Sequence, residues 1–310
     1  MTTLLITHDD CLAHETGAYH PERPDRLRAV LKAMEQDDFR GLVREDAPRA
    51  SLEAMARAHP GNFIPMILEA IPVDALRQID ADTVVSPRSG EAMQRAAGAV
   101  VRAVDAVVKG DVRNAFCAVR PPGHHAESTL AMGFCLVNNV VVGAMHARAV
   151  HGHRRVAVVD FDVHHGNGTQ EMFWDDPEAF YASTHQYPFY PGTGASRERG
   201  AHGNIVNVPL AAGTASDVFR TRFAAELLPA LAAFKPDILL ISAGFDAHKD
   251  DPLAELRLTE NDFAWATAGL MDVARDVCGG RVVSVLEGGY NLDALADCAT
   301  AHVQTLMSKL

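Results

Sequence analysis

Two carboxylates and two imidazoles lie within one short stretch, Asp160-Phe161-Asp162-Val163-His164-His165. The stretch follows an apolar, β-branched run, residues 156–159, that is typical of a buried strand in a parallel sheet. Alternation with a period of two places Asp160, Asp162 and His164 on one side. Carboxylate oxygen and imidazole nitrogen are ligands of Zn²⁺, so the stretch predicts part of a zinc site. A strand end capped by an aspartate, with two surface histidines, explains this motif alone equally well.

Three other predicted strands run into residues that could complete such a site. They end in Pro121-Pro122-Gly123-His124-His125, in Gly244-Phe245-Asp246 and in Glu287-Gly288-Gly289-Tyr290. The carboxyl ends of strands in a wound parallel sheet share one edge, and ligands bind there. Each segment alone is more simply a surface histidine pair, a turn or a buried tyrosine in a bend. Together they supply the parts of a metal-assisted amide hydrolysis.

The roles follow from the residue types. Asp162, His164 and Asp246 would provide three protein ligands and leave one metal position open for water. The metal would lower the pKa of that water and polarise a carbonyl group. A histidine of the His124-His125 pair would act as general base and later as general acid. Tyr290 would donate a hydrogen bond to the developing oxyanion, and the neighbouring glycines would let it move.

These segments need a scaffold of alternating strands and helices, and the apolar patterns predict one. Strands are expected at residues 4–7, 115–119, 156–159, 181–184, 205–208, 237–242 and 281–286. Helices are expected at 27–34, 51–57, 63–70, 91–109, 139–150 and 216–234, from 259 toward 278, and at the C-terminus, with Ser216 and Thr259 as N-terminal caps. This order predicts an α/β fold with an open, mostly parallel wound sheet and helices on both faces. No linker or repeat divides it, so residues 1–310 are expected to form a single domain.

Composition excludes several classes of protein. The 310 residues are 48% hydrophobic and 22% charged, as in a globular protein with a large core, and the formal net charge is −12. Nonspecific nucleic-acid binding needs a basic surface, so it is not expected, whereas an acidic rim would favour cationic substrates. Five cysteines without a CxxC pair give neither a disulfide framework nor a cysteine zinc motif. The start lacks a signal peptide and no apolar run spans a membrane, so a cytoplasmic protein is expected.

In chain order, six segments resemble the zinc-dependent deacetylases of the arginase–deacetylase fold. That family includes histone deacetylases, acetoin-utilisation proteins and acetylpolyamine amidohydrolases. The segments are HPERPDR (20–26), RPPGHHA (120–126), GFC (133–135), DFDVHHGNG (160–168), AGFDAHKDDPL (243–253) and LEGGYNL (286–292). The form HHGNG, with Asn167, is similar to the class II branch and its bacterial relatives, because class I members carry Asp there.

The resemblance implies a division of work around the metal. His125 would be the general base and acid, with His124 as its electrostatic partner. Asp160 would accept a hydrogen bond from His124, and Asn167 would accept one from His125. A neutral amide stabilises an imidazolium less than a carboxylate does, so His125 is expected to stay neutral near pH 7. Tyr290 would polarise the acetyl carbonyl beside one catalytic Zn²⁺.

The resemblance also implies a substrate channel. The Gly133 carbonyl would receive the substrate amide N–H, and Phe134 and Tyr190 would line the walls. Tyr190 adds a hydroxyl where relatives carry phenylalanine. Arg26 would lie near the acetate exit, and Leu253 would stand at the channel mouth.

Monovalent cations, chiefly K⁺, are implied as well. The first site would use carbonyl oxygens and one hydroxyl of five residues: Asp160, Asp162, His164, Ser183 and Thr184. A second site would lie near Phe173 and Asn204. In class II relatives a serine contacts the substrate amide, and the matching stretch here reads His59-Pro60, which puts that hydrogen bond in doubt.

The leading hypothesis is a zinc-dependent deacetylase that removes acetyl or other acyl groups from lysine side chains. An acetylpolyamine deacetylase is the alternative, since polyamine-selective relatives carry an acidic residue where this chain has Leu253. Leucine offers only apolar contact, although Asp250 or Asp251 could swing toward a cation.

An arginase-type hydrolase would need a two-metal carboxylate set, and a non-catalytic acyl-lysine binding module would be favoured by a missing ligand or tyrosine. Expected partners are acyl-lysine proteins or acetylated amines, with no nucleic acid or membrane. The physiological substrate, acyl length, Zn²⁺ against Fe²⁺ and a homo-oligomeric state stay open.

Overall fold

The computed structural model describes residues 2–309, and its centre is one eight-stranded sheet with the order β2-β1-β5-β10-β9-β6-β7-β8. All seven neighbouring pairs in this sheet are parallel. The strands are β1 (Thr3–Thr7), β2 (Val43–Asp46), β5 (Asn114–Cys117), β6 (Val156–Asp160), β7 (Ala179–Gln186), β8 (Ile205–Leu210), β9 (Ile238–Ala243) and β10 (Val282–Leu286). A separate antiparallel hairpin joins β3 (Arg77–Gln78) to β4 (Val84–Val85).

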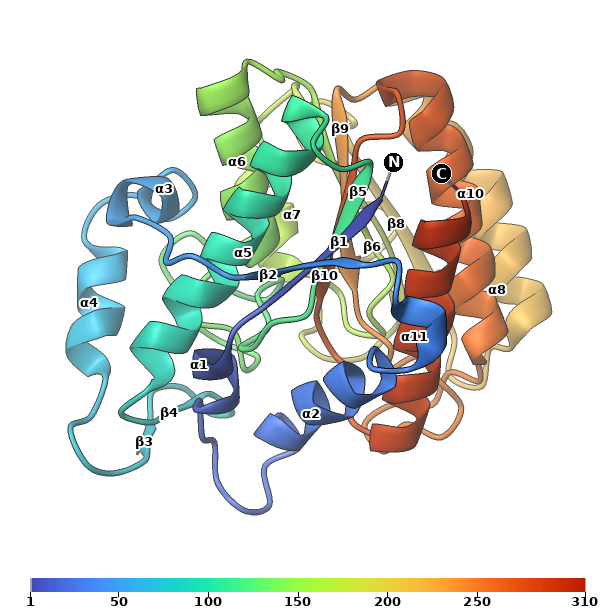
Figure 1. Ribbon diagram of the computed structural model, residues 1–310. Coiled ribbons are helices and arrows are strands. Elements are labelled where there is room, and N and C mark those ends of the chain that lie inside the picture. The colour runs from blue at the N-terminus through green and yellow to red at the C-terminus, as the bar shows by residue number, and fades with distance from the viewer. Residues whose placement is uncertain (1, 310) are drawn as a thin grey trace.

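Helices cover both faces of the sheet, which confirms the predicted fold class (Figure 1). On one face lie α5 (Ser89–Lys109) and α6 (Asn139–His151), and on the other lie α10 (Glu260–Cys278) and α11 (Leu292–Ser308). The remaining helices are α1 (Asp9–Leu12), α2 (Pro24–Ala33), α3 (Leu52–Ala56), α4 (Phe63–Ala70), α7 (Asn167–Phe173), α8 (Ser216–Arg222) and α9 (Leu228–Phe234). The strands β5, β6, β9 and β10 are buried throughout because both faces are covered, and their apolar sequences reflect that.

Two predicted caps had different outcomes. The capping box at Thr259 is confirmed, since Thr259 and Asp262 bond to each other's backbone N–H groups at the start of α10. The predicted helix from Ser216 to Phe234 is confirmed, because α8, a π-helical turn at Phe223–Leu227 and α9 follow one another without a break. The prediction that Ser216 caps this helix is wrong. Ala215 holds the N-cap position, and Ser216 is the first residue of α8, where its Oγ donates to the Asp262 carboxylate over 2.7 Å.

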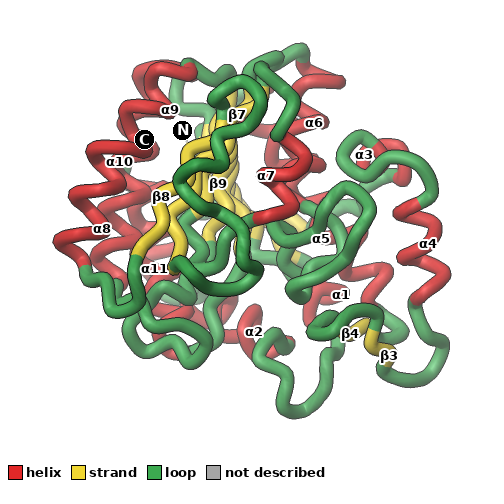
Figure 2. Tube along the Cα trace, turned by 180° about the vertical axis from the view of Figure 1, so that it is seen from behind, coloured by secondary structure: helices red, strands yellow, loops and turns green. Residues whose placement is uncertain are grey.

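The strands end together at one edge of the sheet. Asp160 at the end of β6 pairs with Ser183 on β7 and Ser242 on β9, and Leu286 on β10 pairs with Ala243. The segments that follow these strands therefore meet, and long loops gather along this edge (Figure 2). No helix within residues 2–309 combines the length and the apolar character that crossing a bilayer requires.

Candidate active site

Three predicted metal ligands meet at this edge. One donor atom from each of Asp162, His164 and Asp246 lies within 4.8 Å of the others, and all three residues are buried. His164 Nδ1 lies 3.2 Å from Asp162 Oδ1 and 3.0 Å from Asp246 Oδ2. Despite burial, these carboxylates raise the pKa of His164 to about 10. The Asp162 and Asp246 carboxylates therefore attract positive charge strongly, and a divalent cation would supply that charge.

The backbone around the three side chains fits a metal site. Gly288 N donates to Asp162 Oδ2 over 2.8 Å, and Val163 N donates to Asp246 Oδ1 over 2.8 Å. These bonds aim the carboxylates at His164, as supporting bonds do around bound metals. A Cβ at Gly244 or Gly288 would collide with these carboxylates, so the backbone must be glycine there. Two carboxylates and one imidazole match the three protein ligands of a catalytic zinc site.

The two neighbouring histidines have opposite electrostatic environments. His124 Nδ1 lies 3.0 Å from Asp160 Oδ2, which also accepts from the Tyr181 hydroxyl over 3.1 Å. Although burial opposes it, the Asp162 and Asp160 carboxylates raise the pKa of His124 well above its ordinary value. Burial and the two nearby imidazoles of His124 and His164 lower the pKa of His125 well below its ordinary value. At neutral pH the pair therefore holds one charged and one neutral imidazole.

The hydrogen bonds of Asn167 fix the tautomer of His125. Asn167 Oδ1 lies 2.8 Å from His125 Nδ1, while Asn167 Nδ2 donates to Glu127 Oε1 over 2.8 Å. Because the amide oxygen only accepts, Nδ1 of the neutral His125 carries the proton. The lone pair on Nε2 is then available as a base.

Buried groups behind the channel hold Tyr290 in place. Asp251 Oδ2 accepts from Tyr290 N over 2.7 Å, and Arg26 Nε donates to Gly289 O over 2.6 Å. The Arg26 guanidinium also lies 4.8 Å from the centre of the Tyr290 ring. Burial raises the pKa of Tyr290 well above its ordinary value, so the hydroxyl stays a donor at neutral pH. Arg26 is fully buried behind this segment and does not line the channel.

A narrow channel of about 150 Å³ leads to these groups. Eight residues line it: Asp82, His125, Gly133, Phe134, His164, Tyr190, Leu253 and Tyr290. Gly133 has φ 58° and Phe134 has φ 69°, in the left-handed region that a phenylalanine rarely adopts. A Cβ at Gly133 would come within 2.5 Å of the His125 ring, so only glycine fits against the base. The predicted channel residues Gly133, Phe134, Tyr190 and Leu253 are thus brought together.

Asp82 is a channel residue that the sequence reasoning missed. Its Oδ1 accepts from Gly133 N over 2.9 Å, and Thr83 Oγ1 accepts from Phe134 N over 3.1 Å. The β3–β4 hairpin therefore holds the strained turn of the channel wall. Burial and the Asp82 carboxylate raise the pKa of Tyr190. The only sequence signal was a polar stretch between two short apolar runs, which did not indicate a hairpin.

The structure bears on two expectations about nearby residues: it agrees with the doubt over a substrate hydrogen bond at His59-Pro60, and it corrects the expectation for Asp251. His59 does not reach the channel, because its ring is buried and bonded to Ser128 O over 3.1 Å and to Asn138 N over 2.8 Å. Asp251 does not swing toward a cation, because its carboxylate is buried and accepts from the backbone N–H groups of Leu253, Tyr290 and Asn291. Both side chains are held by groups inside the protein.

The residues expected around monovalent cations are buried where β6 and β7 end. Asp160 and Ser183 are partners in the sheet register, and Ser183 Oγ lies 2.8 Å from His185 Nδ1. At the expected second site, Asn204 Nδ2 lies within 2.8 to 3.1 Å of the carbonyl oxygens of Phe173, Asp176 and Ala179. The Asn204 amide group therefore donates to the three backbone carbonyls nearest to it.

A second His and Asp cluster lies away from the channel. Asp105 on α5 accepts from Nε2 of His146 over 2.8 Å and contacts Nε2 of His151 at 2.6 Å. Arg57 Nη1 lies 3.2 Å from His146 Nδ1, and arginine can only donate, so the proton of His146 is on Nε2. That nitrogen has no lone pair for a metal. His146 is buried, and Asp105 and Arg57 supply its hydrogen-bond partners.

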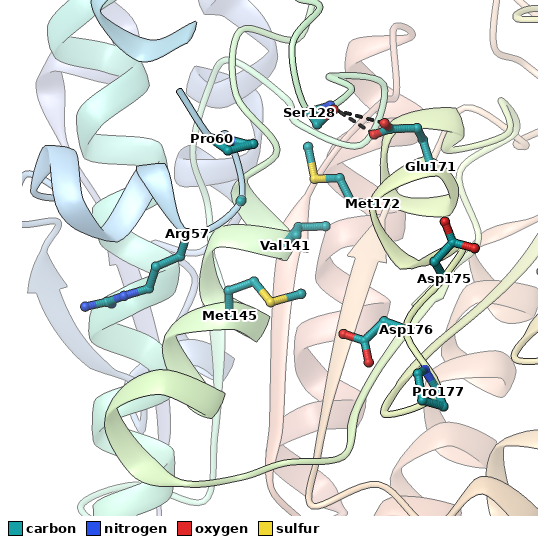
Figure 3. A pocket seen from close by; sticks show the side chains of 11 residues that line it. Arg57, Pro60, Ser128, Val141, Met145, Glu171, Met172, Asp175, Asp176 and Pro177 are labelled. Carbon is teal, nitrogen blue, oxygen red and sulfur yellow. Dashed lines mark hydrogen bonds between the residues drawn. The ribbon is translucent and has the colours of Figure 1, made fainter. Parts of the chain in front are cut away.

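A larger pocket, about 490 Å³, lies between the loop after α3 and helices α6 and α7 (Figure 3). Val141, Met145 and Met172 form its apolar floor, and the Glu171 side chain at its edge accepts two bonds from Ser128. Another of its acids, Asp176, is paired with Arg148. Its size exceeds that of the channel, but the channel holds the buried titratable groups and is therefore the candidate active site.

Comparison with known proteins agrees with this geometry. A family model described as the histone deacetylase domain matches residues 20–306. The chain is 36% identical to the type-2 histone deacetylase 2 of Dictyostelium discoideum, over 98% of this chain and 21% of that protein. It is 38% identical to the polyamine deacetylase HDAC10 of Homo sapiens, over 99% of this chain and 48% of that protein. Both relatives are much longer than this chain. The crystal structure of the HDA15 HD domain superimposes with a TM-score of 0.94 at 36% identity, covering 99% of this chain and 88% of that one.

Proposed function

Because this chain belongs to the histone deacetylase family and is a hydrolase of amide bonds, we propose that it removes acetyl groups from lysine side chains with zinc as its cofactor. One observation supports this most strongly. The Asp162, His164 and Asp246 cluster lies at a narrow channel that also contains His125 and Tyr290. These are the ligand set, the base and the oxyanion donor that hydrolysis of an amide requires.

The protein groups divide the chemistry between them. Zinc held by Asp162, His164 and Asp246 would lower the pKa of water and polarise the acetyl carbonyl. His125 takes the proton of the attacking water at Nε2, since its Nδ1 proton is held by Asn167. The charged His124, held by Asp160, offsets negative charge that develops beside it.

The proton then moves to the leaving amine. His125, now protonated, returns it to the lysine nitrogen, which leaves as the free amine. The Tyr290 hydroxyl donates to the acetyl oxygen while charge builds there. The Gly133 carbonyl accepts the substrate amide N–H, and the rings of Phe134 and Tyr190 flank the lysine chain. A potassium ion at Asp160, Asp162, His164, Ser183 and Thr184 is part of the proposal.

An acetylated polyamine is the second candidate substrate. The Asp82 carboxylate in the channel wall favours it, because a second ammonium group on the substrate could pair with it. A relative from Homo sapiens is named a polyamine deacetylase. Leu253 argues against it, because its side chain at the channel offers no charge. Peptide lysine is therefore the preferred substrate in this proposal.

Turnover of defined substrates tests the proposal. Release of acetate is measured for an acetyl-lysine peptide and for N-acetylspermidine, before and after removal of metal with a chelator, and after zinc is added back. We expect the peptide to be hydrolysed faster, with activity lost on chelation and restored by zinc. Turnover that persists in metal-free protein would contradict the zinc assignment. A faster reaction with the polyamine would select the second candidate.

A further inference from the structure

An apolar groove of about 280 Å³ lies next to the channel, between α4, the β3–β4 hairpin and the loop before Gly133. We name it the hairpin groove; its apolar lining includes Met66, Ile67, Ile79, Leu130 and Ala131. Met66 is 50% exposed and Leu130 is 46% exposed, so two large apolar side chains stand open to solvent at its edge. These two side chains give the groove an apolar edge that the side chain of a ligand could contact. In Figures 1 and 2, α4 and the hairpin lie side by side.

The chain connects this groove to the channel along both of its walls. Ala131 in the groove precedes Gly133 in the channel by two residues, and Ile79 in the groove precedes Asp82 in the channel by three. An extended chain spans at most about 3.3–3.6 Å per residue, so these pairs of Cα atoms are at most about 7 and 11 Å apart. A peptide segment of two or three residues spans such distances.

We propose that the hairpin groove binds an apolar side chain of a peptide substrate, two or three residues from the acyl-lysine. This inference rests on the proposed function and specifies its substrate class. The volume is below the roughly 300–1,000 Å³ of sites for drug-sized ligands, so it suits one or two side chains. The lining residues are neutral except Arg77, so the groove complements an apolar or weakly acidic segment rather than a basic one. A polyamine carries no branch that could fill the groove.

Binding here would also bear on the channel wall. The hairpin that borders the groove holds the Gly133-Phe134 turn through Asp82 and Thr83. A side chain packed against Ile79 would therefore contact the same hairpin that shapes the channel. The groove itself contains none of the channel residues, so its contact with the peptide is expected to act on KM.

The test compares acetyl-lysine peptides that differ at one position. Leucine and serine are exchanged at each position within three residues of the acetyl-lysine, and kcat/KM is measured alongside acetyl-lysine with blocked termini. We expect leucine at one position two or three residues away to raise kcat/KM about fivefold to tenfold, through KM, as burial of much of one apolar side chain implies. The Met66→Glu variant should lose this preference and keep its rate on the blocked amino acid. Leu130→Ser, at another half-exposed position, should lose it as well.

Leu52→Glu is the matched control, since Leu52 is 51% exposed on α3 and does not line the groove. It should keep the preference. The inference would be overturned if leucine raised kcat/KM at no position, or if the preference for leucine survived in both groove variants. In either case, turnover of the blocked amino acid would still support the proposed function. If no acetyl-lysine substrate is hydrolysed, the proposed function fails, and fluorescence anisotropy of labelled peptides tests the groove by itself. If the groove variants Met66→Glu and Leu130→Ser change the oligomeric state of the protein but not its preference for leucine, the groove binds a second copy of the chain. That result would overturn the inference.

Discussion

Glu22 holds two buried arginines, and Glu22→Gln should destabilise the fold strongly. Glu22, Arg26 and Arg120 are each fully buried. Glu22 Oε2 accepts from Arg120 Nη2 over 2.7 Å, and Oε1 accepts from Arg26 Nη1 over 3.0 Å and from Arg120 Nε. Glutamine keeps the size of the side chain but removes its charge. Two guanidinium groups would then remain buried without a carboxylate.

The magnitude follows from the cost of an uncompensated buried charge. Removing one partner of a buried ion pair typically costs about 3–5 kcal/mol of unfolding free energy. At about 2 °C per kcal/mol for a chain of this size, Tm should fall by about 6–10 °C. Turnover should fall too, because Arg26 bonds to the carbonyls of Glu287 and Gly289, next to Tyr290. Urea unfolding and a thermal scan at pH 7.5 measure the two stability changes.

Acid titration provides an independent check on the same group. Although burial opposes it, Arg120 and Arg26 lower the pKa of Glu22 from 4.5 to about 2. A depressed carboxyl pKa contributes stability that is fully present above pH 4.5 and is lost as pH falls toward 2, about 3 kcal/mol in all. The unfolding free energy of the Glu22→Gln variant should therefore fall less between pH 4.5 and pH 2 than that of the unchanged protein. The control Asp25→Asn removes an exposed ion pair with Arg28 and should cost below about 1 kcal/mol. If Glu22→Gln, like the control, lowers the unfolding free energy by less than about 1 kcal/mol, the reasoning is refuted.

Three further outcomes are expected at the site. We expect loss of bound metal and of activity in each of the variants Asp246→Ala and His164→Ala, because the two ligands that remain bind zinc weakly. Stoichiometric metal with full activity in either variant would contradict the ligand assignment. Tyr290→Phe should keep metal and substrate binding but lower kcat by roughly 10²–10³, the cost of one oxyanion donor, and a near-normal kcat with unchanged Tm would make Tyr290 structural. Leu253→Glu should shift the ratio of kcat/KM from acetyl-lysine peptide toward acetylspermidine, and an unchanged ratio would show that this position does not select the substrate.

Much of the scaffold could be predicted because its signals are local. The strands β5, β6, β9 and β10 are runs of apolar residues, and α5 ends at Gly110, whose φ of 77° suits glycine. The edge strand β2 was missed because its sequence, Val-Arg-Glu-Asp, is mostly charged and exposed. It is a strand only because it pairs with β1, and no residue within it indicates that partner. Long-range pairing overrides local propensity there.

The metal ligands and the histidine pair could be predicted because each follows a recognisable strand. The residues that hold them could not. Asp251 accepts hydrogen bonds from the backbone N–H groups of Tyr290 and Asn291, which lie 39 and 40 positions further along the chain. The sequence around Asp251 gives no sign of these partners. Glu22 similarly reaches Arg120 across 98 positions. Such buried partners are specified by the assembled fold, and their sequence neighbours resemble an ordinary polar loop.

Asp82 and Leu253 face the same channel and argue for opposite substrates, and the surroundings of Asp82 support the peptide that we propose. The Asp82 carboxylate already accepts from Gly133 N over 2.9 Å and from Thr83 Oγ1 over 2.9 Å, both at Oδ1. Those bonds offset part of its charge, and the residue is half-buried, so solvent partly screens it. Exposed ion pairs contribute about 0–1 kcal/mol, and with the upper end of that range for this half-buried carboxylate we expect Asp82 to change the preference between a polyamine and a peptide by about fivefold. An apolar contact in the hairpin groove is expected to match or exceed this, and only a peptide can make it. The peptide is therefore the expected substrate even though an acid lines the channel.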